Sequence, residues 1–224
     1  MATTRARRAP SFSDDPIDAF LLWVRSNGRT AAAACIIVAG VAGAGLLYRS
    51  ASTSRASQAD AALLGPRQSI IAGNIPLAQM DLKRIITRFK GTAAATEAAM
   101  LLATTYYDQH KYADGVTALE QARTTGPAKP FATATIALIG DGYAQEGKYR
   151  EAAAEYERAA GVTSYKIERD RLRAAAARAY ATGTDTTAAV RLWTDLSADP
   201  KSPEAGEAHL RLGELTAKPI AKAS

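Results

Sequence analysis

The 224-residue sequence contains a single cysteine, Cys35, and only two histidines, His110 and His209. One cysteine cannot form an intrachain disulfide, and it leaves no second thiol for a zinc or redox site. Neither histidine has a Cys, His or acidic partner at the spacing of metal ligands, so we interpret both as surface or turn residues. The sequence therefore predicts no metal and no cofactor, and its cysteine content does not indicate a cellular compartment.

Motifs that would carry catalysis are also lacking. The glycine-rich stretch AGVAGAG, residues 39–45, has neither the Lys-Ser/Thr ending of a phosphate-binding loop nor the GxGxxG spacing. Glu151 and Glu155 share one face of a predicted helix and could suggest acid–base chemistry. Arg158 lies on the same face, however, and we interpret these side chains as solvent-exposed. We predict no catalytic residues and do not expect an enzyme.

Aromatic residues make up only 7% of the chain, yet several of them recur at a fixed interval. Tyr106, Tyr143 and Tyr180 are spaced 37 residues apart. In the same frame, small residues lie three positions before and nine after each tyrosine, and a bulky residue lies thirteen after it. These positions are Ala103, Gly140 and Ala177, then Gly115, Ala152 and Ala189, then Leu119, Tyr156 and Trp193. A period of this length, with helical spacing inside each unit, predicts an array of helix pairs.

The best-preserved copy resembles the tetratricopeptide repeat. The residues that carry the resemblance are Ile139, Gly140, Tyr143, Gly147, Tyr149, Ala152, Tyr156 and Ala159. The resemblance implies an all-α solenoid of helix pairs. From the residues themselves we expect Gly147 to end the first helix, and Gly161 to end the second, in left-handed conformations. His110 and Thr184 replace the turn glycine in the neighbouring copies, so we expect those two turns to close differently.

The expected repeat domain covers residues 49–220. Its copies lie near residues 59–95, 96–132, 133–169 and 170–205, followed by a capping helix at 204–217. The first copy is the weakest, because Ser69 replaces the tyrosine. A period of 37 residues exceeds the usual 34 of this repeat, and we place the additional residues in the loops GPAKP and GVTSYK.

Residues 30–48 contain no charged side chain and are bracketed by Arg29 and Arg49. As a helix this segment would be about 28 Å long, which is close to the thickness of a bilayer's hydrocarbon core. We therefore predict one transmembrane helix. Ala39, Gly40, Gly43 and Ala44 form small-residue faces on which another membrane helix could pack, although small residues there could also simply be tolerated.

Residues 1–29 are predicted to be a cytoplasmic tail with a short interfacial helix in DDPIDAFLLWVRSNG. A cleaved signal peptide is the main alternative to a retained anchor. Arginines near the two ends of the span do not decide its orientation. The arginines of the distal tail favour a cytoplasmic N-terminus, with the repeat domain in the periplasm.

This layout of tail, span and alanine-rich repeat domain resembles the ancillary bacterial inner-membrane proteins that accompany the SecYEG translocon. The resemblance includes the FLLWVRSNGRTAAA junction and the GTAAATEAAMLLATTYYDQHKYADGVTALEQA stretch. It implies a periplasmic chaperone-like factor whose partners are translocon components and exported polypeptides. Contact with lipid through the span is also implied.

The net charge is +6, with a pI near 9.5, but the basic run KIERDRLRAAAAR has no interleaved aromatic residues for stacking on bases. We interpret the run as solvated repeat surface and predict no nucleic-acid partner. If the first helices line a groove, that groove would be acidic at one end and basic at the other. Arg171, Ala174 and Arg178 would face it at the basic end. Such a groove suits an extended polypeptide. The candidate groove residues are Glu97, Met100, Thr104, Asp108, Asp141, Arg171 and Arg178.

Two functions are compatible with an anchor followed by an array. In the first, the chain is a membrane-tethered scaffold that binds newly exported or partner polypeptides transiently. In the second, it is a permanent accessory subunit of a large integral-membrane complex, such as a respiratory or photosynthetic one. The two differ in whether partners co-purify in fixed stoichiometry.

Overall fold

The computed structural model describes residues 28–125 and 129–217, except for the side chains of residues 28, 30, 31 and 34–39. The described residues form helices and no strand. The chain divides into two compact units, residues 1–53 and 54–224. In chain order the helices are α2 (Gly28–Ala62), α3 (Leu64–Ile71), α4 (Ile75–Arg88), α5 (Ala93–Tyr107), α6 (Tyr112–Thr124), the 3₁₀ helix η1 (Lys129–Phe131), α7 (Ala132–Gln145), α8 (Tyr149–Val162), α9 (Lys166–Thr182), α10 (Thr186–Ser197) and α11 (Ala205–Thr216).

The described part of the first unit is residues 28–53 of α2. Its large apolar side chains Val41, Leu46, Leu47 and Tyr48 are 69–79% exposed. Among the described residues, no helix is both long enough and apolar enough to cross a membrane. The most apolar part of the predicted span, residues 34–39, lies outside the residues whose side chains are described. The predicted tail at residues 1–27 lies outside the described residues altogether.

The helix α2 does not end where the predicted span ends at residue 48, but continues to Ala62. It is interrupted before α3 because Pro66 has no backbone N–H to donate to the carbonyl of Ala62. The Leu63 amide instead donates to Asp60 O at 3.2 Å, which tightens the chain locally. Leu63 and Pro66 are both buried, so the end of α2 together with α3 is the first helix of the outermost repeat.

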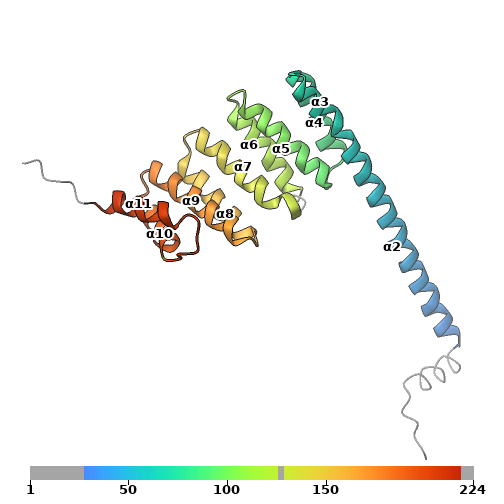
Figure 1. Ribbon diagram of the computed structural model, residues 1–224. Coiled ribbons are helices and arrows are strands. Elements are labelled where there is room, and N and C mark those ends of the chain that lie inside the picture. Colours follow the sequence, from blue (N-terminus) through green and yellow to red (C-terminus); the bar gives the residue numbers. More distant parts are fainter. Residues whose placement is uncertain (1–27, 126–128, 218–224) are drawn as a thin grey trace, which may run out of the picture. The chain divides into compact units, whose positions relative to one another are not determined.

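The second unit is an all-α array of helix pairs, in which each first helix packs on the second helix of its own pair and on that of the preceding pair (Figure 1). The four second helices α4, α6, α8 and α10 each begin 37 residues after the one before, at Ile75, Tyr112, Tyr149 and Thr186. The small and bulky positions of the predicted repeat form the core, since Ala103, Ala152, Ala177, Ala189, Leu119 and Trp193 are fully buried. Alanines at these positions let the helices approach closely, while the bulky residues fill the remaining space.

All four turns within pairs close in the same way, which corrects our expectation for His110 and Thr184. Gly73, His110, Gly147 and Thr184 are 37 residues apart and all have a positive φ, between 59° and 77°. In each turn the next amide donates to a carbonyl five residues earlier, as Lys148 N does to Tyr143 O at 2.9 Å. This bond is the closing hydrogen bond of a Schellman turn. The closure therefore depends on the backbone geometry and is kept even where glycine is absent.

Gly161 does not end its helix in a left-handed conformation, contrary to our expectation. It lies inside α8, which continues to Val162, and the positive φ values of the described glycines occur only at Gly73, Gly91 and Gly147. The loop that follows, Thr163–Tyr165, has only three residues, because α9 begins early and is 17 residues long. Part of the additional length of the repeat is thus helix instead of loop.

Replacing Thr184 with glycine is expected to stabilise the array by about 0.5–1 kcal/mol. A β-branched residue at a φ of 64° is strained, and glycine removes that strain at a smaller cost in unfolded-chain entropy. The exposed Thr194 inside α10 provides the control, because glycine there should destabilise by a similar amount. Urea denaturation of both variants checks the prediction, and it would be contradicted if the midpoints of unfolding of both variants shifted equally and in the same direction.

Candidate partner-binding surface

The surface predicted for partner binding is carried by the first helices α5, α7 and α9. We call its residues the first-helix face: Glu97, Met100, Thr104, Asp108, Asp141, Arg171 and Arg178. The side chains differ in how far they are engaged within the array. Only those that are exposed and without an intramolecular partner can offer their charge to another protein.

On α5 the first-helix face carries one engaged and one unengaged carboxylate. Glu97 forms an ion pair with Arg67 of α3. Met100 is partly buried against the core, and Thr104 is exposed. Asp108, at the C-terminal end of α5, is exposed and has no ion-pair partner among the residues that the structure describes. The acidic charge at this end of the face is therefore mainly that of Asp108.

On α7 the carboxylate of Asp141 has a structural partner. The Tyr156 hydroxyl of α8 donates to Asp141 Oδ1 at 2.6 Å. Burial, and then this hydrogen bond, raise the pKa of Tyr156. The Tyr156 ring lies against Gly140, where a Cβ would come 2.8 Å from Cε1. Asp141 thus fixes a core tyrosine of its own repeat, although its side chain is still accessible.

On α9 the charge of Arg178 is neutralised by the last helix. Its Nε donates to Glu207 Oε1 at 2.8 Å, and its Nη2 donates to Glu204 Oε2 at 3.4 Å. The hydrogen bond with Glu207 is the main cause that raises the pKa of Arg178, and the same bond lowers the pKa of Glu207. Arg178 therefore joins α9 to α11 (Ala205–Thr216), a role that the sequence pattern did not reveal.

Arg171 is the member of the face whose positive charge is uncompensated. Its side chain is exposed and has no ion-pair partner in the described parts of the chain. Ala174, which we expected beside it on the groove, is instead fully buried in the core. Arg171 and Arg178 thus lie on the same helix face, but the buried alanine between them shows that this face is covered in part by its neighbours.

The N-terminal part of the basic run is also engaged internally. Lys166 Nζ lies 2.5 Å from Asp170 Oδ2 and 2.7 Å from Asp199 Oδ2. These carboxylates raise the pKa of Lys166, Asp170 first. Arg169 Nη2 donates to the carbonyl of Thr163 at 3.2 Å and so caps the end of α8. The run mostly stabilises the junction around α9 and does not form one basic patch.

Glu155 corrects our interpretation of the acidic helix face of α8. It is only 7% exposed, and its carboxylate lies between Arg158, at 2.9 Å, and Arg123 of α6, at 3.3 Å. Its equivalents in the 37-residue frame, Ala118 and Leu192, are also buried. The repeat frame could therefore have indicated that this position faces a neighbouring helix.

The predicted membrane-packing face lies in the first unit. An added Cβ at Gly40 or Gly43 would meet no atom within 4 Å, and Ala44 is exposed. The side chain of Ala39 lies outside the described residues. Across residues 28–125 and 129–217, no group of three or more His, Cys, Asp or Glu side chains could hold a metal ion.

Comparison with solved structures identifies the fold. The crystal structure of Podosopora anserina putative kinesin light chain nearly identical TPR-like repeats is 18% identical in sequence, with a TM-score of 0.55, over 71% of this chain and 86% of that one. The array has a TPR-like fold. The crystal structure of a point variant of the same protein matches with a TM-score of 0.54 and 18% identity, over 71% of this chain and 85% of that chain. No protein-family model and no curated protein matches the sequence.

Proposed function

We propose that the chain is a membrane-tethered scaffold that binds other polypeptides on its first-helix face. In a TPR-like array the stacked repeats form an extended surface, and each repeat adds contact area for an extended partner. The observation that carries the proposal is Arg171, an exposed and unpaired cation on a helix whose other face positions are buried or neutralised. On this proposal the chain is not an enzyme and does not bind nucleic acid.

The tether in this proposal is the segment 30–48 of α2, in a bacterial inner membrane, with the N-terminus in the cytoplasm and the array in the periplasm. Its uncharged sequence and the exposed apolar side chains of Val41, Leu46, Leu47 and Tyr48 support the proposal. The resemblance to ancillary SecYEG-associated proteins makes translocon components and exported polypeptides the proposed partners, in a chaperone-like role.

A permanent accessory subunit of a respiratory or photosynthetic complex is the second candidate. It is favoured by the open small-residue surface around Gly40 and Gly43, on which another membrane helix could pack. Purification of the full chain in mild detergent, followed by mass spectrometry, separates the two. Translocon components with varied exported proteins support the scaffold, whereas a fixed set of stoichiometric subunits supports the permanent subunit.

Charge reversal at Arg171 is expected to weaken partner binding about tenfold, because one exposed cation becomes a repelling anion. Arg171→Glu is a cleaner test than the same change at Arg178, which would place a third carboxylate beside Glu204 and Glu207 and loosen α11. Arg84→Glu, on α4 and away from the first-helix face, is the control. Co-purified partner can be quantified for each variant, and undiminished binding by Arg171→Glu would count against this face.

A further inference from the structure

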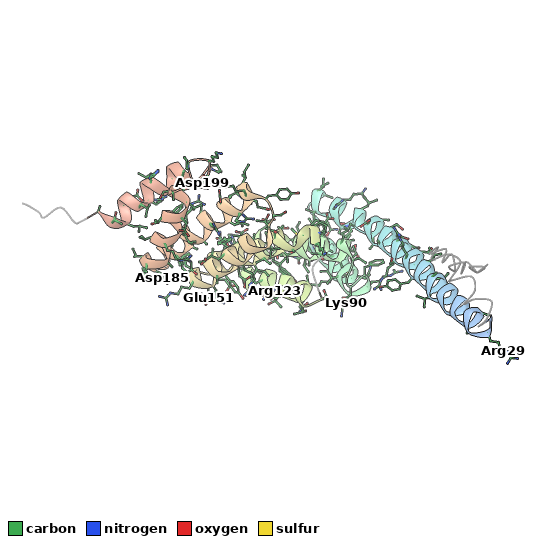
Figure 2. All side chains as sticks on the ribbon, turned by 90° about the horizontal axis from the view of Figure 1, so that it is seen from below. Arg29, Lys90, Arg123, Glu151, Asp185 and Asp199 are labelled. Carbon is green, nitrogen blue, oxygen red and sulfur yellow. The ribbon has the colours of Figure 1, made fainter. Side chains whose placement is uncertain are left out.

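The junctions between consecutive second helices are not equivalent, although these helices are in strict 37-residue register. Between α6 and α8, Arg123 Nη1 lies 3.3 Å from Glu155 Oε2. Between α8 and α10, Arg191 Nη2 lies 2.9 Å from Glu157 Oε2. Each ion pair spans the space between two neighbouring second helices. Figure 2 labels Arg123, together with Lys90, Glu151 and Asp185, along one edge of the second unit.

The first junction, between α4 and α6, has no such bridge. The positions that correspond to Arg123 and Glu155 are Ile86 and Ala118, and those that correspond to Glu157 and Arg191 are Lys83 and Thr117. In the part of the chain that the structure describes, no ion pair joins α4 to α6. The space that charged side chains fill at the later junctions is therefore left open here.

That space is a cleft with two adjoining parts, which we call the second-helix cleft. One part has a volume of about 350 Å³, and the other, of about 260 Å³, shares Ile86, Thr87 and Gln121 with it. Ile86, Ala118 and Leu102 of α5 give it an apolar floor. The hydroxyls of Thr87 and Thr117 donate to carbonyls of their own helices and can still accept a hydrogen bond from an extended backbone, and the Gln121 amide can both donate and accept.

The charges at the cleft are mainly positive. Lys83 lines one part and Lys90 the other, and neither has a carboxylate partner among the described residues. Lys83 Nζ lies 5.5 Å from the centroid of the Tyr106 ring, which holds it at the edge of the cleft. The one acid in the lining, Asp114, lies in the first turn of α6, where the helix dipole favours a carboxylate.

We propose that the second-helix cleft is a docking site for a short acidic and apolar segment of a partner protein. Carboxylates of that segment pair with Lys83 and Lys90, and its apolar side chains lie on Ile86, Leu102 and Ala118. The incoming segment takes the place of the ion pair that bridges each later junction. This site is separate from the first-helix face and does not depend on it, so either one can fail without the other.

A synthetic hexapeptide tests the site. A fluorescein-labelled peptide that alternates Asp or Glu with Leu is titrated with the full chain in mild detergent, and its anisotropy is measured. We expect binding that weakens about tenfold when the acids are replaced by Asn and Gln, and about tenfold for the Lys83→Glu/Lys90→Glu chain. Both lysines are exposed, so their replacement does not disturb the core.

A second variant fills the cleft with an ion pair copied from the next junction of the array. Ile86→Arg/Ala118→Glu reproduces at α4–α6 the pair that Arg123 and Glu155 form at the next junction, and it should abolish binding of the peptide. Lys201→Glu, an exposed lysine between α10 and α11 that belongs to neither surface, should leave that binding unchanged.

Three results would overturn the proposal. They are no binding by the unaltered chain, equal binding of the carboxamide peptide, and unchanged binding by the lysine double variant. The lysine double variant tests the proposal even if the cleft-filling variant does not fold.

Discussion

Truncation of Trp193 to alanine is expected to destabilise the array by about 3–5 kcal/mol, the usual cost of deleting a large buried aromatic side chain. Trp193 is 0% exposed and is the largest fully buried side chain among the described residues. It belongs to the core cluster that includes residues of α7 to α11, so its removal leaves a cavity shared by several helices. Chemical denaturation followed by far-UV circular dichroism measures the loss.

The conservative variant Trp193→Phe separates packing from hydrogen bonding. The buried Nε1 of Trp193 has no hydrogen-bond partner in the described structure, so phenylalanine loses no bond and removes an unsatisfied donor. We expect it to cost less than about 1.5 kcal/mol. The proposed role of Trp193 is to stabilise the core by packing. It would be contradicted if Trp193→Phe lost as much stability as Trp193→Ala, or if both variants lost little. Because repeat arrays can unfold in parts, the cooperativity of each transition must be compared as well.

The position of Trp193 in the core follows directly from the sequence, because the 37-residue frame aligns it with Leu119 and Tyr156. A position that is bulky in every copy, with small residues at fixed offsets, faces the same neighbours in each copy. The helix pairs and the TPR-like fold were predictable for this reason. The periodicity reports the features that the copies share, so it predicts the structure correctly wherever the same position has the same surroundings in every copy.

The sequence is less informative where the chain departs from its own repeat. The turns at His110 and Thr184 close like those at glycine because flanking helices impose the left-handed conformation, although local propensity disfavours it. Likewise, Pro66 marks the interruption after α2, but nothing in the sequence indicated that α2 continues through residue 48. Tertiary packing outweighs local preference at the two turns, whereas α2 continues through residue 48 along side chains that are largely exposed.

The candidate surface was predictable as a set of positions, but not as a set of charges. Which carboxylate meets Arg178 depends on how the segment between α10 and α11 directs Glu204 and Glu207 back onto α9. Helical periodicity places a side chain on a face, whereas an ion pair depends on the register between helices that are distant in sequence. The free charges Asp108 and Arg171 could therefore be found only in three dimensions.

Replacing Gly142 with alanine is expected to destabilise the array by about 2 kcal/mol, although alanine is the better helix former. Gly142 of α7 faces Tyr107 of α5, whose hydroxyl donates to Leu138 O at 2.9 Å. A Cβ at residue 142 would overlap with the Tyr107 hydroxyl and with Val116 Cγ2, and would lie 2.9 Å from Tyr107 Cζ. Tyr107 is packed and hydrogen-bonded, so either the helices separate or that hydrogen bond is lost.

Gly161 of α8 provides the matched control, because an added Cβ there meets no atom within 4 Å and its φ is not positive. Gly161→Ala should stabilise by up to about 1 kcal/mol, the ordinary gain of alanine over glycine in a helix. Both substitutions add one methyl group to a helix, so their opposite signs in urea denaturation would isolate the contact with Tyr107. If both variants were stabilised alike, α5 and α7 would not be held together by the close approach of Tyr107 to a bare backbone. The junction between these two repeats would then depend on the other apolar contacts of this cluster, whose buried members are Ala103, Val116, Leu119 and Ile139.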